Sequence, residues 1–326
     1  MKRSALLLTA LLLLGACQNG SPETESGISE RTDPITGQVV RSGYVAVPGG
    51  NVFYEMSNPE AAGIPLLLIH GGPGGTSCGF GLLDNEIRDR PVIRYDQLET
   101  GRSDRPGLRE QWNIAHSVAE IDAIRESLGL DQLVLMGWSW GGSVAAEYVL
   151  EGQRDVEAVV FSGPLLSTPA WIEDANALVA TMPADLQAVI REHEAAGTYN
   201  DPAYLAATDS FYARFMDPIG YPPVPECEGV SGNNEVYTTM WGPTEFTATG
   251  TLLDYDRTDQ LGDIDVPVLI LAGEFDEARP VTMERFASMM PDARLEVIPG
   301  AGHAAPVERP GLVASLITDF LATVEQ

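Results

Sequence analysis

Positively charged residues are scarce in this sequence. Its 326 residues include 19 lysines and arginines against 47 aspartates and glutamates, giving a formal net charge of −28 at pH 7 and a pI near 4.3. Nucleic-acid binding needs lysine and arginine to neutralise phosphates, so this balance argues against a nucleic-acid partner. The summed negative field would repel anionic substrates and mildly favour cationic ones. We favour salt tolerance or plain solubility over substrate steering as the reason for the charge.

Histidine and cysteine are also rare, with four and three residues respectively. They form no Cys/His cluster with the spacing of a metal site, and the sequence contains no cofactor motif and no internal repeat. The glycine-rich stretch HGGPGG at 70–75 lacks the following Lys-Ser/Thr of a phosphate-binding loop. We therefore expect neither a metal nor a cofactor.

A hydrophobic run long enough to anchor the chain across a bilayer is missing as well. The apolar stretch at 5–14 follows two basic residues and is too short to span, which is typical of an export signal. Its end, LGAC at 14–17, resembles a bacterial lipobox. That resemblance implies that residues 1–16 form a lipoprotein signal peptide and that Cys17 carries lipid. The protein would then be anchored on the periplasmic side of the cell envelope, and Gln18, which is not an aspartate, favours the outer membrane.

Beyond residue 37, strand-like apolar runs alternate with helix-like amphipathic runs. This alternation predicts an α/β fold with a mostly parallel eight-stranded sheet that helices cover on both faces. The expected strands cover 38–47, 52–56, 65–70, 91–95, 133–136, 156–161, 266–272 and 295–298, and the expected helices cover 114–128, 143–150, 281–290 and 311–323. Residues 17–37 are polar and bury too little apolar area to order themselves, so we expect a flexible tether.

The alternation fails between residues 165 and 256. This segment contains amphipathic and aromatic stretches and a proline-rich break, YPPVP at 221–225. We interpret 165–256 as a helical cap inserted after the sixth strand, which leaves 38–164 and 257–326 as the core of the fold. Cys227 lies in this cap and Cys78 in the core. The two either form a disulfide that pins the cap to the core, which export permits, or remain free thiols.

The most informative motif is GWSWGG at 137–142. Its central serine, Ser139, follows the apolar run 133–136 and precedes the helical run 143–150. A strand, a sharp turn and a helix make the setting of a nucleophile elbow, in which the serine hydroxyl stands clear of the sheet edge. An ordinary glycine-rich turn has the same local pattern. The assignment therefore depends on the partners of a serine nucleophile: a base, an acid that orients the base, and donors for an oxyanion.

His303 is the candidate base. In the elbow arrangement the acid and then the histidine follow the serine along the chain, and two of the four histidines precede Ser139. His193 lies in a charged stretch that is typical of a solvated helix face. His303 follows the strand-like run 295–298 in a loop of small residues, from which a side chain can reach the carboxyl edge of a sheet.

The acid is expected at the end of another strand between Ser139 and His303. The apolar run 266–273 is typical of a strand covered on both faces, and it leads into EFDE at 274–277. We choose Asp276 as the orienting acid. The spacing leaves Glu274 and Glu277 open as alternatives.

The glycine-rich stretch at 70–75 ends the third expected strand and predicts an oxyanion hole. Glycines at a strand end let backbone N–H groups approach a reacting carbonyl closely. Gly72 and Trp140 are the expected donors.

Together these motifs resemble the proline iminopeptidase family of α/β-hydrolase serine aminopeptidases. The resemblance covers the chain from about residue 40 to the end and rests on HGGPG at 70–74, YDQ at 95–97 with GRS at 101–103, GWSWGG at 137–142, GEFDE at 273–277 and GH at 302–303. It implies the α/β-hydrolase fold with Ser139, Asp276 and His303 as the triad. It also implies Gly72 and Trp140 as the oxyanion hole.

In the predicted cap, MWGPTEF at 240–246 is similar to the branch of the family whose cap glutamate helps to bind the substrate's amino terminus. The match implies Glu245 and Glu277 as anchors for a free α-amino group, through charge-assisted hydrogen bonds. A cap over the cleft leaves little room upstream of the first residue, which favours removal of one residue at a time. One position departs from the pattern: Glu99 stands where the family usually has glycine, which leaves the contacts of its loop and the substrate preference open.

We therefore predict a serine aminopeptidase that releases an N-terminal residue, proline or another small or apolar residue, from short peptides through an acyl-enzyme. The alternative is an esterase, lactonase or amidase on a small non-peptide substrate, because one triad serves all acyl transfers. A third possibility is a catalytically silent surface-binding lipoprotein. The preferred first residue and the oligomeric state do not follow from the sequence.

Overall fold

The computed structural model describes residues 27–326, except 34–35, 153–154, 221, 225–226 and 326. The predicted signal peptide, residues 1–16, and Cys17 lie outside the described residues. Within the described ranges, no helix is long and apolar enough to cross a bilayer.

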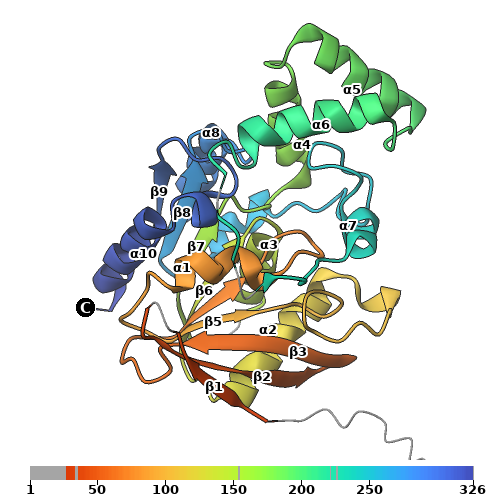
Figure 1. The fold of residues 1–326 in the computed structure, drawn as a ribbon. Helices are drawn as coiled ribbons and strands as arrows, with labels where there is room; N and C mark the ends of the chain where they lie inside the picture. The colour runs from red at the N-terminus through yellow and green to blue at the C-terminus, as the bar shows by residue number, and fades with distance from the viewer. Residues whose placement is uncertain (1–26, 34–35, 153–154, 221, 225–226, 326) are drawn as a thin grey trace, which may run out of the picture.

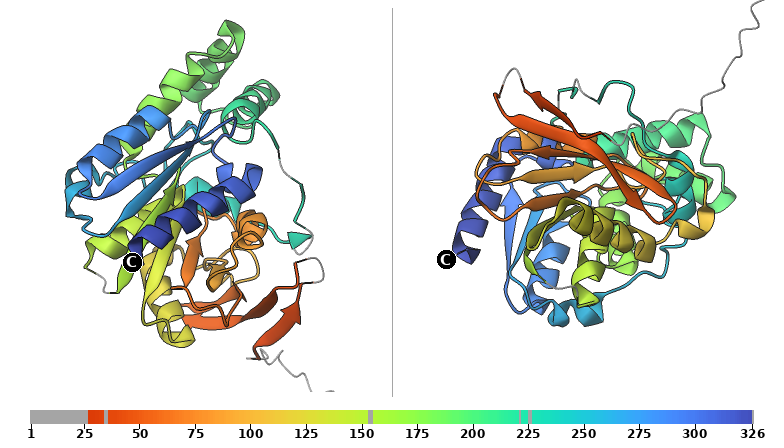
Figure 2. Two further views of the ribbon diagram at one scale, coloured as in Figure 1. Left: turned by 90° about the vertical axis from the view of Figure 1, so that its left-hand side faces the viewer. Right: turned by 90° about the horizontal axis from the view of Figure 1, so that it is seen from below.

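One nine-stranded sheet forms the centre of the molecule, with the strand order β1-β2-β3-β5-β4-β6-β7-β8-β9 (Figure 1). Strands β1 to β3 pair antiparallel, β3 pairs antiparallel with β5, and β4 to β9 are parallel. Figure 2 shows the antiparallel strands at one end of the sheet and β8 and β9 toward the other. The strands are β1 (Ser29–Thr32), β2 (Val39–Val47), β3 (Gly50–Ser57), β4 (Leu66–Ile69), β5 (Val92–Tyr95), β6 (Leu133–Trp138), β7 (Val156–Ser162), β8 (Val268–Gly273) and β9 (Ala293–Ile298).

The sheet confirms the predicted fold class but has one strand more than the eight predicted. The additional strand, β1, lies within 17–37, so the prediction of a flexible tether is wrong for 29–32. All four β1 residues are exposed, and no apolar pattern marks the strand. Its order comes from backbone pairing with β2 and from Arg31, whose guanidinium lies 3.2 Å from a carboxylate oxygen of Glu55.

Helices cover both faces of the parallel part. Leu66 and Leu68 of β4 pack with α1 and α10 on one face, whereas Leu67 and Ile69 pack with α2, α3 and α8 on the other. Burial on both faces explains why these strands are continuous apolar runs in the sequence. The core helices are α1 (Gly81–Asp84), α2 (Ile114–Leu128), α3 (Trp140–Leu150), α8 (Pro280–Met289), α9 (Ala305–Glu308) and α10 (Pro310–Val324), and the short 3₁₀ helices include η1 (Ser77–Phe80), η2 (Arg109–Gln111) and η4 (Thr258–Asp263).

Among the described residues between β7 and β8, four α-helices form what we call the cap: α4 (Thr168–Val179), α5 (Ala184–Ala196), α6 (Pro202–Phe215) and α7 (Asn234–Met240). In Figure 1, α4 to α6 stand above the sheet and α7 lies beside it. The cap helices α4 to α6 bury an apolar cluster of their own, which includes Tyr204 and Phe211. Ser167 pairs with Asp256 in an isolated antiparallel bridge, so both ends of the insertion meet at the core.

A disulfide joins the cap to the core. Cys78 of η1 is bonded to Cys227 of the cap, and their Cα atoms are 5.8 Å apart. Close by, the backbone N–H of Asn233 donates a hydrogen bond to the Gly74 carbonyl at 2.7 Å. Of the two alternatives that the sequence leaves open for these cysteines, the structure therefore contains the disulfide. It holds the segment that leads into α7 against the glycine-rich loop.

Candidate active site

Ser139 lies in a sharp turn between β6 and α3. Its backbone has φ 56° and ψ −120°, a conformation that a non-glycine residue adopts only when the surrounding structure enforces it. The neighbouring glycines make the turn possible, because a Cβ on Gly141 would collide with the Ile69 carbonyl and one on Gly137 with the Gly141 carbonyl. The serine is thereby held at the carboxyl edge of the parallel strands, as a nucleophile elbow requires.

Asp276 contacts His303 directly. One Asp276 carboxylate oxygen lies 2.7 Å from His303 Nδ1, and both side chains are buried. Because a carboxylate accepts, Nδ1 carries the proton and Nε2 is left as the basic nitrogen. The same Asp276 carboxylate accepts from the backbone N–H of Ala278 at 2.8 Å and of Gly273 at 3.2 Å, which fixes its orientation.

The two alternative acids lie elsewhere. Glu274 is exposed, and its carboxylate accepts from the backbone N–H of Gly300 at 2.9 Å. Glu277 lies on the opposite side of the imidazole, with Oε1 3.9 Å from His303 Nε2. Hydrogen-bond geometry therefore selects Asp276 as the group that orients the ring, where the spacing alone did not.

Burial and charge act on His303 in opposite directions. Burial disfavours the imidazolium, but the Asp276 charge and hydrogen bond, together with the Glu245 charge, outweigh it and raise the pKa of His303 above its usual value. Within the described chain, Nε2 has no hydrogen-bond partner. Catalytic hydrogen bonds are often long before substrate binds, so this geometry is compatible with a base that acts on Ser139.

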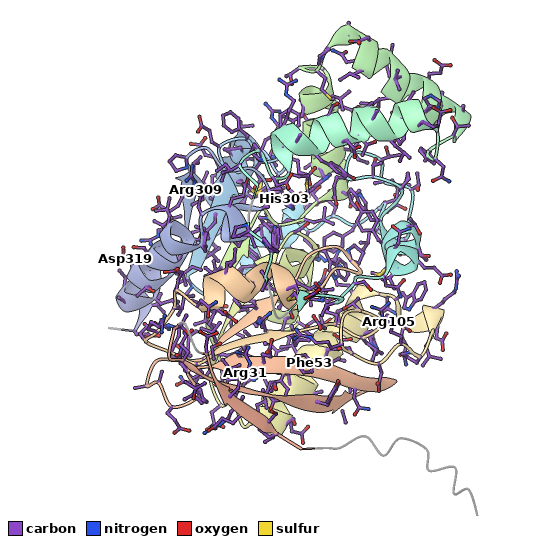
Figure 3. All side chains as sticks on the ribbon, viewed as in Figure 1. Arg31, Phe53, Arg105, His303, Arg309 and Asp319 are labelled. Atoms are coloured by element: carbon purple, nitrogen blue, oxygen red, sulfur yellow. A yellow bond between two sulfur atoms is a disulfide. The ribbon has the colours of Figure 1, made fainter. Side chains whose placement is uncertain are left out.

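The cap helps to position His303. The backbone N–H of His303 donates to the Phe215 carbonyl at the end of α6 at 2.8 Å. The Trp138 indole donates to the His303 carbonyl at 2.9 Å, and the Trp171 ring of α4 packs edge-on against the imidazole with centroids 5.4 Å apart. Figure 3 shows His303 between the cap helices and the sheet. Sequence reasoning missed these contacts because they join segments far apart in the chain.

The predicted oxyanion donors flank Ser139. Trp140 is the first residue of α3, whose leading N–H groups have no partner within the helix. The loop that carries Gly72 passes close to the serine, since a Cβ on Gly71 would lie 3.1 Å from Ser139 Cβ. The carbonyl carbon of a substrate bonded to Ser139 would therefore lie between these two backbone segments.

His70 and Gln97 hold this loop in place, a role that sequence reasoning missed. The Gln97 backbone N–H donates to His70 Nε2 at 3.0 Å, so the ring proton is on Nδ1, which lies 2.9 Å from the Gly71 carbonyl. Burial lowers the pKa of His70 and keeps the ring neutral. The Gln97 side chain also accepts from the Trp140 indole at 3.0 Å, which links the loop to the elbow.

Glu245 and Glu277 come together beside His303. Burial raises the pKa of both carboxyl groups, and the nearby Glu245 and Asp276 charges raise that of Glu277 further. Interactions with His303 and with the Tyr237 hydroxyl partly offset the shift at Glu245. Neither Glu277 carboxylate oxygen has a hydrogen-bond partner among the described residues. Two poorly compensated carboxylates beside a nucleophile make a strong site for a cation.

A cleft of about 250 Å³ opens beside Ser139 and His303. Its lining residues include Gly71, Gly72, Ser139, Met216, Glu245 and His303. The described part of the chain contains no group of three or more His, Cys, Asp or Glu side chains that could hold a metal ion. Ser139, the His303 imidazole and the backbone N–H donors beside them are the groups that acyl transfer needs.

Glu99 has a local structural role. It has φ 73°, and its carboxylate accepts from the backbone N–H groups of Gly107 at 2.5 Å and Leu108 at 3.1 Å. The Glu99 carbonyl accepts from the Asn233 amide of the cap at 3.1 Å. These bonds offset the backbone strain at a position where glycine would adopt this φ freely. Glutamate at position 99 thus lacks the conformational freedom of glycine, but its carboxylate binds the loop at Gly107 and Leu108 and its carbonyl binds the cap.

Gly163, which sequence reasoning also missed, lies against the triad. It has φ 49°, and a Cβ there would be 2.7 Å from His303 Nδ1 and 2.9 Å from an Asp276 carboxylate oxygen. We expect Gly163→Ala to lower kcat by about 100-fold or more, because an ångström-scale displacement of catalytic groups costs that much. Steady-state kinetics would measure it. Gly152→Ala is the matched control, because Gly152 also has positive φ but nothing within 4 Å of the added Cβ; an equal loss in both variants would contradict the prediction.

Known proteins share sequence and fold with this chain. Residues 64–310 match the family model described as alpha/beta hydrolase fold. The proline iminopeptidase of Heyndrickxia coagulans is 36% identical over 284 residues, which cover 86% of this chain and 99% of that protein. The crystal structure of proline iminopeptidase from Mycobacterium smegmatis superposes with a TM-score of 0.78 at 32% identity, covering 87% of this chain and 98% of that one.

More distant structures share the fold alone. An esterase from Exiguobacterium antarcticum superposes with a TM-score of 0.61 at 18% identity, covering 86% of this chain and 98% of that one. Sequence identity separates the two groups of relatives, because the esterase covers the chain to the same extent but is only 18% identical. The chain belongs to the proline iminopeptidase family of α/β hydrolases.

Proposed function

We propose that this protein is a serine aminopeptidase that releases the N-terminal residue of short peptides, proline or another small or apolar residue, through an acyl-enzyme. Family membership supports the reaction class. The observation that carries the proposal is the pair of carboxylates beside His303: Glu245, which lines the cleft, and Glu277, 3.9 Å from His303 Nε2. An esterase has no need of two carboxylates at this position.

Each site residue has a part in the proposed reaction. Ser139 Oγ attacks the first peptide carbonyl while His303 Nε2 takes its proton, and Asp276 holds the imidazole in the required tautomer. The N–H groups of Gly72 and Trp140 stabilise the oxyanion. The protonated His303 then gives its proton to the leaving amine. Water releases the first residue from Ser139, again with His303 as base.

The carboxylate pair gives the proposed enzyme its selectivity. A free α-amino group is cationic at neutral pH and lies one residue from the scissile bond, so charge-assisted hydrogen bonds to Glu245 and Glu277 would place the first carbonyl at Ser139. A peptide bound further along would bring an uncharged amide to the same carboxylates and leave them unpaired. Internal peptide bonds are therefore rejected.

Product analysis tests the proposed function. We expect incubation with Pro-Ala-Gly-Phe to release proline and Ala-Gly-Phe, as detected by mass spectrometry, and the N-acetylated peptide to remain intact. Release of a dipeptide, or equal cleavage of the acetylated peptide, would overturn the proposal.

We also propose that the protein is exported and lipid-anchored to the cell envelope through Cys17, on the periplasmic side and with the outer membrane favoured. The lipobox-like sequence at 14–17 supports this, as does the disulfide between Cys78 and Cys227, which suits an oxidising compartment. Expression in a bacterial host with an alkyne-labelled fatty acid tests it. Label in the wild-type protein and none in Cys17→Ser is the expected result, and an unlabelled wild-type protein would contradict it.

A further inference from the structure

The imidazole of His303 has a carboxylate on each side. Asp276 binds Nδ1 at 2.7 Å, and Glu277 Oε1 lies 3.9 Å from Nε2, the nitrogen that must accept the proton of Ser139. Among the described residues, His303 Nε2 and both Glu277 oxygens have no hydrogen-bond partner. The distance of 3.9 Å is too long for a hydrogen bond, but it places a protonated Nε2 and an ionised Glu277 as a buried ion pair. A proton held on Nε2 in this way would occupy the base.

The charges around the ring favour the protonated form of His303. Asp276 and Glu277 come from the loop after β8, and Glu245 comes from the cap, whereas the Trp171 face of the imidazole is uncharged. The negative charges of Asp276 and Glu245 raise the pKa of His303. The same two charges raise the pKa of Glu277. When no substrate is bound, the imidazolium is the cation that this cluster itself can supply.

We propose that the substrate's α-ammonium group activates the nucleophile by displacing His303 from Glu277. This inference rests on the proposed function and adds a second role for the same carboxylate. In the free enzyme, His303 is protonated at Nε2 and forms an ion pair with Glu277. An ammonium group bound to Glu277 and Glu245 replaces the imidazolium as the partner of Glu277, and the Nε2 proton leaves for solvent. Nε2 is then free to accept the proton of Ser139, so a ligand without an amine meets an enzyme whose base is occupied.

A reagent that has no amine of its own separates activation from substrate binding. In a fluorophosphonate reaction, Ser139 Oγ forms the bond to phosphorus, fluoride leaves, and the hydroxyl proton goes to His303 Nε2. We expect methylammonium chloride to accelerate this labelling of the wild-type protein at pH 7 by about threefold to tenfold, relative to sodium chloride at equal ionic strength. The size follows from freeing a base whose pKa a neighbouring charge shifts by about one pH unit.

Two variants complete the test. Glu277→Gln removes the competing carboxylate and is expected to label about tenfold faster than the wild type without methylammonium, and to gain nothing from it. Glu274→Gln removes the same charge at the exposed end of the same loop and is expected to behave as the wild type does. The wild-type measurement stands by itself if Glu277→Gln fails to fold.

Three results would overturn the inference: no acceleration of wild-type labelling by methylammonium, slower labelling in its presence, or slower labelling of Glu277→Gln than of Glu274→Gln. The proposed function is tested separately, because its experiment measures peptide products and this one measures the rate of labelling. An enzyme that releases only single N-terminal residues but shows no ammonium effect keeps its function and loses this inference. An enzyme that is activated by ammonium but does not release N-terminal residues would lose the proposed function and keep the ammonium effect on His303.

Discussion

Replacing Ser139 with alanine is expected to lower kcat/KM for a prolyl p-nitroanilide by about 10⁴-fold or more, which is the effect of removing the nucleophile from a working triad. Alanine keeps the strained backbone at φ 56° and adds no atoms to the cleft, so the fold should be unchanged. Steady-state kinetics and fluorophosphonate labelling would measure the loss. Residual activity within 100-fold of the wild type would mean that another group performs the attack.

A second substitution at the same position separates catalysis from folding. Ser139→Gly should be equally inactive, but glycine adopts positive φ without strain, so its free energy of unfolding should rise by about 1 kcal/mol. An inactive variant that is more stable than the wild type would show that the backbone strain serves the nucleophile.

The second large effect concerns Glu120, a buried carboxyl group behind the elbow that the reaction does not use. One of its oxygens accepts from the Leu98 N–H at 3.0 Å; the other, in the described part of the chain, has no hydrogen-bond partner. It borders a cavity of about 30 Å³, and burial raises its pKa from 4.5 to about 8. Nearby His116 is no compensating cation, because burial lowers its pKa.

The sign of the pH dependence follows from this shift. The folded state holds the Glu120 proton more tightly than the unfolded state, so the stabilisation is complete below pH 4.5 and is lost as the pH rises through about 8. Between pH 5 and pH 9, the wild type should lose about 3 to 5 kcal/mol more unfolding free energy than Glu120→Gln, at about 1.4 kcal/mol per unit of pKa difference. Urea unfolding at both pH values measures this.

The control for Glu120 lies on the same helix. Glu126→Gln removes the same charge from an exposed position of α2 and should follow the wild type at both pH values. If Glu120→Gln loses stability with pH as steeply as Glu126→Gln does, the carboxyl group is not held protonated in the folded protein.

Local signals explain how much of the fold the sequence predicts. The helix expected at 114–128 has those bounds in the structure, because Asn113 caps its start and Gly129, with φ 66°, ends it. Buried strands such as β8 are visible as apolar runs, since both of their faces are covered. Strand β1 is exposed along its whole length, so only its pairing with β2 identifies it.

The same distinction applies to the site. Ser139 and His303 could be proposed from chain order and loop composition, whereas the choice of Asp276 over Glu274 and Glu277 needed the hydrogen bond to His303 Nδ1. No local pattern marks Gly163, because its importance comes from its contact with His303, which lies far along the chain. The cap contact of His303 and the fate of the two cysteines depend on tertiary structure in the same way.

The central claim is that a free α-amino group selects the substrate, and the most direct test is the ratio of kcat/KM for prolyl p-nitroanilide to that for its N-acetyl form. We predict a ratio of about 10³ or more in the wild type, because acetylation leaves buried carboxylates without a cation. Glu245→Gln and Glu277→Gln should each reduce the ratio, and p-nitrophenyl esters should be poorer substrates than the free-amine anilide. A ratio near one, or turnover of esters alone, would contradict the claim and assign the site to an esterase.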